Sequence, residues 1–395
     1  MVRSRLIALT LVTAIAPAWA LDSLDRELGR NLFDRNWVSA PASTKADDGL
    51  GPFSDAGSCL ACHLRVSSYQ QPEERIAEGA IIRLGSAEGQ GDPIYGLQLQ
   101  RRASPGLLPE ARVDIAWRQD SALRVPMLQF QELSFGAFAA TTRYALRRPP
   151  RLEGVGVLAR IPEAEILSRA DADDANNDGI SGRAAWIVDS SGKRALGRFG
   201  WRAGQATLLA QTEAAFALDL GMSTSGRPAP WGDCTMAQAY CRMAPHGAGP
   251  GEVEISNTIR DLTVAFLEAT PAPISPEQKG REIFARVGCG ACHATPRLGA
   301  GLSVNAYTDL LLHDLGPGLN DGIKEGAAEP GEWRTPPLWN MAATLRTGGL
   351  LHDGRALTVE EAIEWHDGEA TGARTKARAL NEAEKATLFA FINGL

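Results

Sequence analysis

Two pentapeptides of the form C-x-x-C-H constrain this chain more than any other feature of its sequence. They occupy residues 59–63 and 289–293. Two thiols three residues apart lie on one face of a helical turn, where both can form thioether bonds to one haem while the adjoining histidine reaches the iron. With 6 cysteines and 6 histidines in 395 residues, chance would give roughly 0.001 such motifs. Two covalently bound haem c groups are therefore predicted, held by Cys59, Cys62, His63, Cys289, Cys292 and His293.

Two other uses of a C-x-x-C pair fit these segments less well. A zinc site needs four ligands, and its cysteine pairs usually lie close to each other or to a pair of histidines. Here the two copies are 230 residues apart and each has its own adjoining histidine. A thioredoxin-like redox pair needs a βαβ setting, which neither flank suggests. Haem attachment is the favoured interpretation.

The first 20 residues have the pattern of a secretory signal peptide. Arg3 and Arg5 form a basic start, residues 6–16 are apolar, and Ala-Trp-Ala at 18–20 is typical of a cleavage site. An uncleaved anchor is the alternative, but no other apolar run approaches the ~20 residues that span a bilayer. We expect export to the periplasm and no membrane span in the mature chain. Cleavage would move the formal charge from −7 to −9, which argues against a nucleic-acid partner.

The order of predicted elements suggests a mainly α chain with two cytochrome c-type haem domains. An N-terminal domain would cover residues 21–270, with a large insertion at about 143–250. After a Pro-rich linker, a C-terminal domain would cover 275–395. The inserted segment is rich in Pro and Gly and contains a predicted β-hairpin around residues 185–199. We therefore expect an irregular and β-hairpin segment placed within two helical haem units.

The insertion carries a candidate calcium loop. Asp174, Asn176 and Asp178 alternate and are followed by a glycine, as in the first half of a D-x-N-x-D-G loop. Position 12 of an EF-hand count is Ala185 instead of glutamate, so a full EF-hand is not supported. The segment is either a calcium site or a solvated acidic turn.

The two cysteines outside the haem motifs are predicted to form a disulfide. Cys234 and Cys241 would close a short loop, and an oxidising compartment favours this pairing. The alternatives are free thiols or a metal site that includes His246.

The first haem is predicted to have an open or weakly held iron. No histidine occurs between His63 and His246, and four methionines are the main alternative ligands: Met127, Met222, Met236 and Met243. Without a strong second axial ligand, peroxide could bind this iron. A methionine ligand, or His246 folding back, would instead close it.

The second haem has three candidate distal ligands: His313, His352 and His366. Thr358 opens a short predicted helix with a capping box, and His366 lies on the apolar face of that helix. We favour His366, with His352 as the alternative and His313 third. Ligation by two imidazoles would leave no open position, so this haem would carry electrons.

Several further motifs resemble those of the bacterial di-haem oxidoreductases, relatives of di-haem cytochrome c peroxidases and of MauG. The resemblance covers nearly all of the mature chain through DGLGPF (48–53), RPPRLEG (148–154), DGISGR (178–183), GRFGW (197–201), YTDLLLHD (307–314), WRTPPLW (333–339) and LHDGR (351–355). It implies that one haem passes electrons to the other, which reduces hydrogen peroxide. Gln100 and Glu110 look similar to the glutamine and glutamate beside the peroxidatic haem, which would make them catalytic. His366 stands where those relatives have Met or Tyr, and their distal histidine after the first motif is missing.

The leading hypothesis is an exported, peroxidase-like di-haem oxidoreductase in which electrons pass from the C-terminal to the N-terminal haem. Its expected partners are a small redox donor protein, a cytochrome or cupredoxin, and hydrogen peroxide or another small oxidant. A non-catalytic electron-transfer cytochrome is the chief alternative, and an accessory protein whose haems oxidise a partner is the third.

Overall fold

The computed structural model describes residues 23–44, 48–63, 79–120, 123–273, 279–299 and 302–395. The predicted signal peptide lies outside the described residues. Among the described residues, no helix is long and apolar enough to cross a membrane.

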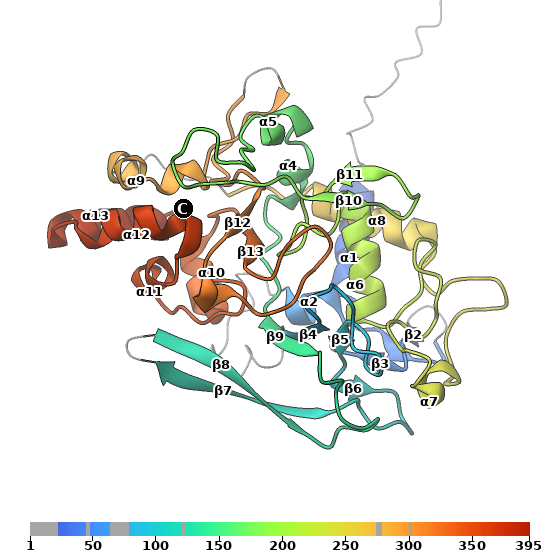
Figure 1. Cartoon of the computed structure of the whole chain (residues 1–395). Helices are drawn as coiled ribbons and strands as arrows, with labels where there is room; N and C mark the ends of the chain where they lie inside the picture. Colours follow the sequence, from blue (N-terminus) through green and yellow to red (C-terminus); the bar gives the residue numbers. More distant parts are fainter. Residues whose placement is uncertain (1–22, 45–47, 64–78, 121–122, 274–278, 300–301) are drawn as a thin grey trace, which may run out of the picture.

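Four helices from distant parts of the sequence build the surroundings of the first pentapeptide (Figure 1). They are α1 (Ser23–Asp34), α2 (Cys59–Cys62), α6 (Leu208–Asp219) and α8 (Asn257–Glu268). α1 packs tightly on α8 because Gly29 has no side chain at the crossing: a Cβ there would lie 2.1 Å from the Leu262 carbonyl oxygen.

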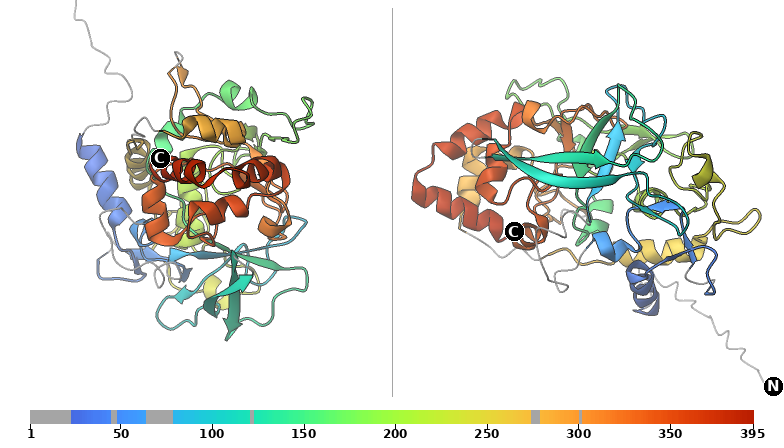
Figure 2. Two further views of the ribbon diagram at one scale, coloured as in Figure 1. Left: turned by 90° about the vertical axis from the view of Figure 1, so that its left-hand side faces the viewer. Right: turned by 90° about the horizontal axis from the view of Figure 1, so that it is seen from below.

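A small antiparallel sheet and a long hairpin follow the first pentapeptide. β4 (Ile81–Gly85) lies between β5 (Gln98–Leu99) and β9 (Arg143–Arg147). β7 (Arg112–Asp120) and β8 (Leu123–Gln131) form the hairpin, paired from Arg112 with Gln131 to Asp120 with Leu123. Figures 1 and 2 show this hairpin extending beneath the C-terminal helices.

These strands correct the predicted fold class. Of the described residues, 31% are helical and 18% lie in strands or bridges, so this part of the chain is mixed instead of mainly α. Most of the β structure lies before residue 143, ahead of the segment predicted as the insertion. β4, β5 and β9 are short and give little pattern, whereas in β7 Val113, Ile115 and Trp117 alternate regularly with exposed residues, a strand signal that the prediction missed. The hairpin predicted around 185–199 is present as β10 (Trp186–Val188) and β11 (Arg194–Leu196).

Short elements connect these parts. They are β1 (Val38–Ser39), β2 (Asp48–Leu50), β3 (Phe53–Ser54), β6 (Arg102–Ala103), α4 (Val155–Ala159), α5 (Glu163–Leu167), α7 (Ala239–Arg242), β12 (Leu312–Asp314), η3 (Pro317–Leu319) and β13 (Glu332–Arg334). β1 and β2 pair in parallel, whereas β3 with β6 and β12 with β13 pair antiparallel.

The C-terminal part is a helical unit around its own apolar core. Its elements are α9 (Arg281–Val287), η1 (Cys289–Ala291), α10 (Met341–Gly348), α11 (Val359–Glu364), η4 (Gly368–Ala370), α12 (Thr371–Arg378) and α13 (Glu382–Asn393). Thr358 caps α11 by accepting a hydrogen bond from the Glu361 amide, and Asn381 and Glu384 form a capping box on α13. Caps of this kind can be predicted from the sequence because each depends on residues within one helical turn.

The two halves share a core. One apolar cluster contains Phe33 and Leu267 from the N-terminal half together with Leu310 and Trp339 from the C-terminal half. The β7–β8 hairpin adds a polar contact, since Arg124 donates to the carbonyl oxygens of Gly354 and Arg355. The predicted boundary near 270–275 stays a prediction, and the two halves are packed together across it.

Candidate functional site

The first pentapeptide is presented by a single helical turn. Ser58 caps α2 by accepting a hydrogen bond from the Ala61 amide, and Cys59 and Cys62 begin and end the turn as free thiols. His63 follows, with its Nδ1 3.0 Å from the Pro150 carbonyl oxygen. Because a carbonyl only accepts, Nδ1 carries the ring proton and Nε2 is left with a free lone pair. Burial lowers the pKa of His63, which favours this neutral, metal-binding form.

The second pentapeptide repeats this arrangement on a 3₁₀ turn. Cys289 and Cys292 are again free thiols. His293 has its Nδ1 2.9 Å from the Tyr307 carbonyl oxygen, so its Nε2 is also available as a ligand. Burial, together with the neighbouring His366, lowers the pKa of His293 to about 4. Both motif histidines are therefore neutral near pH 7.

His366 lies opposite His293. The two ring centroids are 6.5 Å apart, with the rings tilted by 51°. Two imidazoles that bind one metal from opposite sides, with metal–nitrogen bonds of about 2 Å, have centroids about 6 Å apart. The Nδ1 of His366 is 2.6 Å from the Ala362 carbonyl oxygen, so its Nε2 is free as well. The residues present therefore fit an iron held between two imidazoles.

The other two candidate distal histidines are engaged elsewhere. Both ring nitrogens of His313 meet carboxylates, Nε2 with Asp309 at 2.9 Å and Nδ1 with Glu369 at 2.6 Å. Burial opposes its protonation, but these carboxylates raise the pKa of His313 well above its usual value. His313, Asp309 and the Cys292 thiol also lie close together. In the described part of the chain, these three residues are the one cluster of His, Cys, Asp or Glu side chains close enough to hold a metal ion. Because both of its ring nitrogens are already hydrogen-bonded to carboxylates, His313 is not free to ligate a haem.

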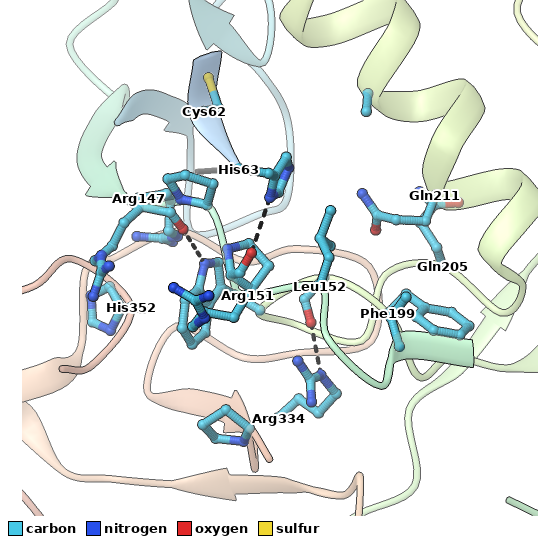
Figure 3. A pocket seen from close by; sticks show the side chains of 18 of the residues that line it. Cys62, His63, Arg147, Arg151, Leu152, Phe199, Gln205, Gln211, Arg334 and His352 are labelled. Carbon is cyan, nitrogen blue, oxygen red and sulfur yellow. Dashed lines mark hydrogen bonds between the residues drawn. The ribbon is translucent and has the colours of Figure 1, made fainter. Parts of the chain in front are cut away.

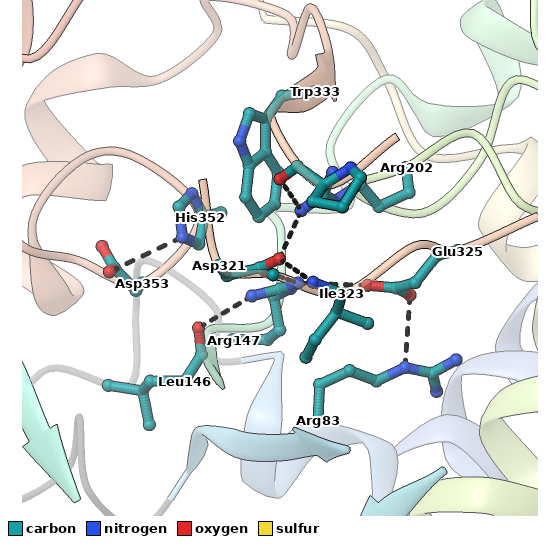
Figure 4. A network of polar contacts seen from close by, with 12 residues as sticks. Arg83, Leu146, Arg147, Arg202, Asp321, Ile323, Glu325, Trp333, His352 and Asp353 are labelled. Atoms are coloured by element: carbon teal, nitrogen blue, oxygen red, sulfur yellow. Dashed lines mark hydrogen bonds and ion pairs between the residues drawn. The ribbon is translucent and has the colours of Figure 1, made fainter. Parts of the chain in front are cut away.

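His352 stacks on Trp333, with ring centroids 3.6 Å apart and an interplanar angle of 7°. Burial and nearby arginines lower the pKa of His352 well below its usual value. On the opposite side of the indole, a buried ion-pair network joins the two halves of the chain (Figure 4). In it Arg147 and Arg202 both pair with Asp321 and both lie over the Trp333 ring.

One continuous cavity of about 560 Å³ reaches both motif histidines. Its size is typical of ligand pockets. Cys59, Cys62, His63, His293, His352 and His366 all line it, together with α6 and the polypeptide around Pro150. Figure 3 shows His63 on one wall and Gln211, from α6, pointing into the same space. The walls include both cysteines and the histidine of the first pentapeptide, whereas of the second pentapeptide only His293 is among the lining residues and Cys289 and Cys292 are not.

No imidazole or thioether of the N-terminal half faces His63 across the described part of the cavity. Met222 is buried elsewhere, and Met127, Met236 and Met243 are exposed side chains outside the lining. His246 is also exposed and outside it. The one methionine on the cavity wall, Met341, belongs to the core of the C-terminal unit. Residues 64–78, which are not described, contain neither His nor Met.

Gln100 and Glu110 lie behind the cavity wall and are not among its lining residues. Glu110 is buried and accepts hydrogen bonds from the Gln100 amide at 2.5 Å and from the Gln238 side chain. Burial raises the pKa of Glu110 to about 8. Their catalytic role stays a prediction.

Two polar residues near Gln100 do line the cavity: Gln98 and Asp219. Asp219 is the last residue of α6 and was missed in the sequence. The one feature of the sequence that could have pointed to Asp219 is that it is the only aspartate in the mostly apolar stretch 208–220.

The remaining predicted sites lie outside this cavity. Cys234 and Cys241 form the predicted disulfide, which closes the loop that carries Gln238. In the candidate calcium loop, the Asp178 amide donates to Asp174 at 3.0 Å and to Asn176 at 2.8 Å. These bonds are those of a tight polar turn, and calcium binding stays a prediction.

Comparison with known proteins agrees with this geometry. A family model described as "Di-haem oxidoreductase, putative peroxidase" matches residues 137–395, which include the second pentapeptide and His366. The chain belongs to the di-haem oxidoreductase family. Membership implies two haems, and their attachment to the two cysteine pairs of this di-haem oxidoreductase stays a prediction.

No curated protein matches this di-haem oxidoreductase. Among solved structures, hydrazine synthase of Kuenenia stuttgartiensis, pressurised with xenon, aligns over 100% of both chains with 14% sequence identity and a TM-score of 0.39. We draw no functional inference from a likeness this distant.

Proposed function

We propose that this di-haem oxidoreductase is an exported peroxidase that reduces hydrogen peroxide, or another small oxidant, at the haem held by Cys59, Cys62 and His63. Electrons would enter from a small cytochrome or cupredoxin through the haem held by Cys289, Cys292 and His293. The observation that carries the proposal is the difference between the two sites. The ring centroids of His366 and His293 are 6.5 Å apart. In contrast, no histidine or methionine of the N-terminal half lines the cavity opposite His63.

When bound, the haems would supply the electron storage, since reducing one peroxide to two waters consumes two electrons and two protons. The protein's share is to fix what each iron can bind. The Pro150 and Tyr307 carbonyls hold His63 and His293 in the tautomer that offers Nε2. With His293 and His366 both as ligands, the C-terminal haem would have no free position for substrate and would only exchange electrons.

The cavity walls would also exclude competing chemistry. The side of α6 that faces the cavity is largely apolar, with Leu208, Ala215 and Leu218 on the wall. An apolar wall admits a molecule as small as peroxide and limits the approach of larger reductants to the reactive haem. The donor protein would therefore deliver electrons at the other haem.

Electron paramagnetic resonance of the purified ferric protein tests the proposal. We expect one high-spin and one low-spin haem, and peroxide-dependent oxidation of a reduced cytochrome or cupredoxin. Two low-spin signals without peroxide turnover would instead identify an electron carrier. Export is tested separately by the mass of the mature chain, which should begin near Leu21 and carry two haems.

A further inference from the structure

We propose that Asp219 donates the proton in peroxide reduction at the haem of Cys59 and Cys62, and that Gln98 and Asp55 position it. This inference rests on the proposed function. It names a residue that the resemblance to di-haem peroxidases does not, since that resemblance points to Glu110.

The first argument is location. Asp219 ends α6 and lines the cavity together with His63 and both attachment cysteines. After burial, its charge is the largest influence that raises the pKa of the Cys59 and Cys62 thiols, which places it close to where the haem is attached. Glu110 has no such position, because it is covered by Gln100 and Gln238.

The Gln98 side-chain amide holds two carboxyl groups close together, the buried Asp55 and the half-buried Asp219. The Gln98 Nε2 donates to Asp219 Oδ1 at 2.8 Å and to Asp55 Oδ2 at 2.9 Å. The backbone locks the pair, since the Asp55 amide donates to the Asp219 carbonyl oxygen at 2.9 Å. Two carboxylates this close in a buried site disfavour double ionisation, so one of them tends to keep a proton.

Of the two carboxyl groups, Asp219 is the one that we expect to keep the proton. Asp55 forms an ion pair with Arg101 at 3.2 Å, which favours its ionised form. No ion pair of Asp219 is present in the described part of the chain, and the charge of Arg83 opposes the rise in its pKa without cancelling it. Burial, and then the charge of Asp55, raise the pKa of Asp219 to about 7 despite the Gln98 hydrogen bond. A group poised near neutral pH is suited to general acid catalysis.

In the proposed reduction, one hydrogen peroxide takes two electrons from the haems and two protons. The O–O bond breaks, and two waters form. The Asp219 carboxyl gives one proton to the departing oxygen and is left as a carboxylate. Solvent then returns a proton to it before the next cycle.

The test compares Asp219→Asn with a matched control, Asp233→Asn. Asp233 is half-buried like Asp219 and accepts hydrogen bonds from the backbone amides of Leu97 and Gln98, but it does not line the cavity. For Asp219→Asn we expect a kcat for peroxide lower by about 100-fold or more, with two haems still present by mass. The control should keep its kcat, and Asp219→Glu should recover part of it.

A second readout does not depend on turnover. The reduction potential of the N-terminal haem should vary with pH around neutrality in the wild type and lose that dependence in Asp219→Asn. In Asp55→Asn the loss of the neighbouring charge should shift the pH dependence to lower pH. An unchanged kcat and an unchanged pH profile in Asp219→Asn would overturn the inference.

The same measurements separate this inference from the proposed function. If the wild type shows no peroxide turnover, the peroxidase proposal fails, and the pH dependence of the potential alone then decides whether Asp219 exchanges a proton with the haem site. If Glu110→Gln loses more activity than Asp219→Asn, Glu110 is the donor and the inference is wrong.

Discussion

His63 and His293 are presented in the same way, each donating Nδ1–H to a backbone carbonyl, but the walls opposite them differ. Before His293 stands His366, from the loop after α11, with its own ring proton directed to a carbonyl. Before His63 stands α6, which brings Gln211 and small or apolar side chains. Two pentapeptides of the same C-x-x-C-H form would therefore acquire different chemistry from what the fold places across the cavity, and each prediction below tests one part of that difference.

The largest expected effect comes from removing one haem at a time. The double substitution Cys289→Ala/Cys292→Ala should lower the intact mass by one haem, abolish donor-dependent peroxide turnover and leave a high-spin signal. Cys59→Ala/Cys62→Ala should also lose one haem and turnover, but leave a low-spin signal. If each double variant instead left the signal expected for the other, the roles assigned to the two haem sites would be reversed.

Replacing the distal imidazole should alter the second site alone. We expect His366→Met to replace the low-spin bis-imidazole signal and to raise the reduction potential of that haem, because a Met/His pair favours the reduced iron. His352→Gln is the matched control, since His352 stacks on Trp333. Potentiometry with spectroscopic detection would measure both. A change in the His352 variant without one in the His366 variant would move the ligand to His352.

The helical scaffold of the first site should be sensitive at the crossing of α1 and α8. Gly29→Ala would place a Cβ 2.1 Å from the Leu262 carbonyl oxygen, so we expect a loss of about 1–3 kcal/mol in the free energy of unfolding. Gly372→Ala in α12 meets nothing within 4 Å and should stabilise its helix by about 0.5–1 kcal/mol. Denaturant unfolding of the haem-loaded proteins would measure both. Equal effects would mean that the crossing is not tight.

The smallest effect is a pH dependence confined to the first half. Burial raises the pKa of Glu110 to about 8 from its usual 4.5. Because the folded state holds this proton more tightly than the unfolded chain, the associated stability is present at low pH and is lost as the pH rises towards 8. Glu110→Gln removes the titrating group and keeps one of the two acceptor oxygens, so whatever its overall stability, its thermal midpoint should fall less between pH 5 and 8, by a few degrees. Parallel pH curves for the two proteins would contradict this.

Much of the chemistry could be predicted because it is local in sequence. The cysteine pairs, their histidines, the capping residues of α11 and α13 and the Cys234–Cys241 disulfide all depend on residues within a few positions of one another. The strands at 81–147 could not be predicted as well, because β4 pairs with β9 some 60 residues later, and such pairing leaves little local pattern.

Asp219 shows the same limit within the site. Its neighbours Gln98 and Asp55 lie more than 100 residues away in the chain, and nothing in the local sequence joins them. Gln100 and Glu110 carry the expected spacing, but the turn between β5 and β7 directs Glu110 towards Gln238 and away from the cavity.

The sequence by itself determined which residues can be bonded to haem and that there are two such groups, because thioether attachment needs only one short peptide. Only the tertiary structure decided that His293 faces a second imidazole, that of His366, whereas α6 lies on the cavity wall before His63. Coordination across a cavity depends on side chains that chain folding brings together, and here His293 and His366 are 73 positions apart.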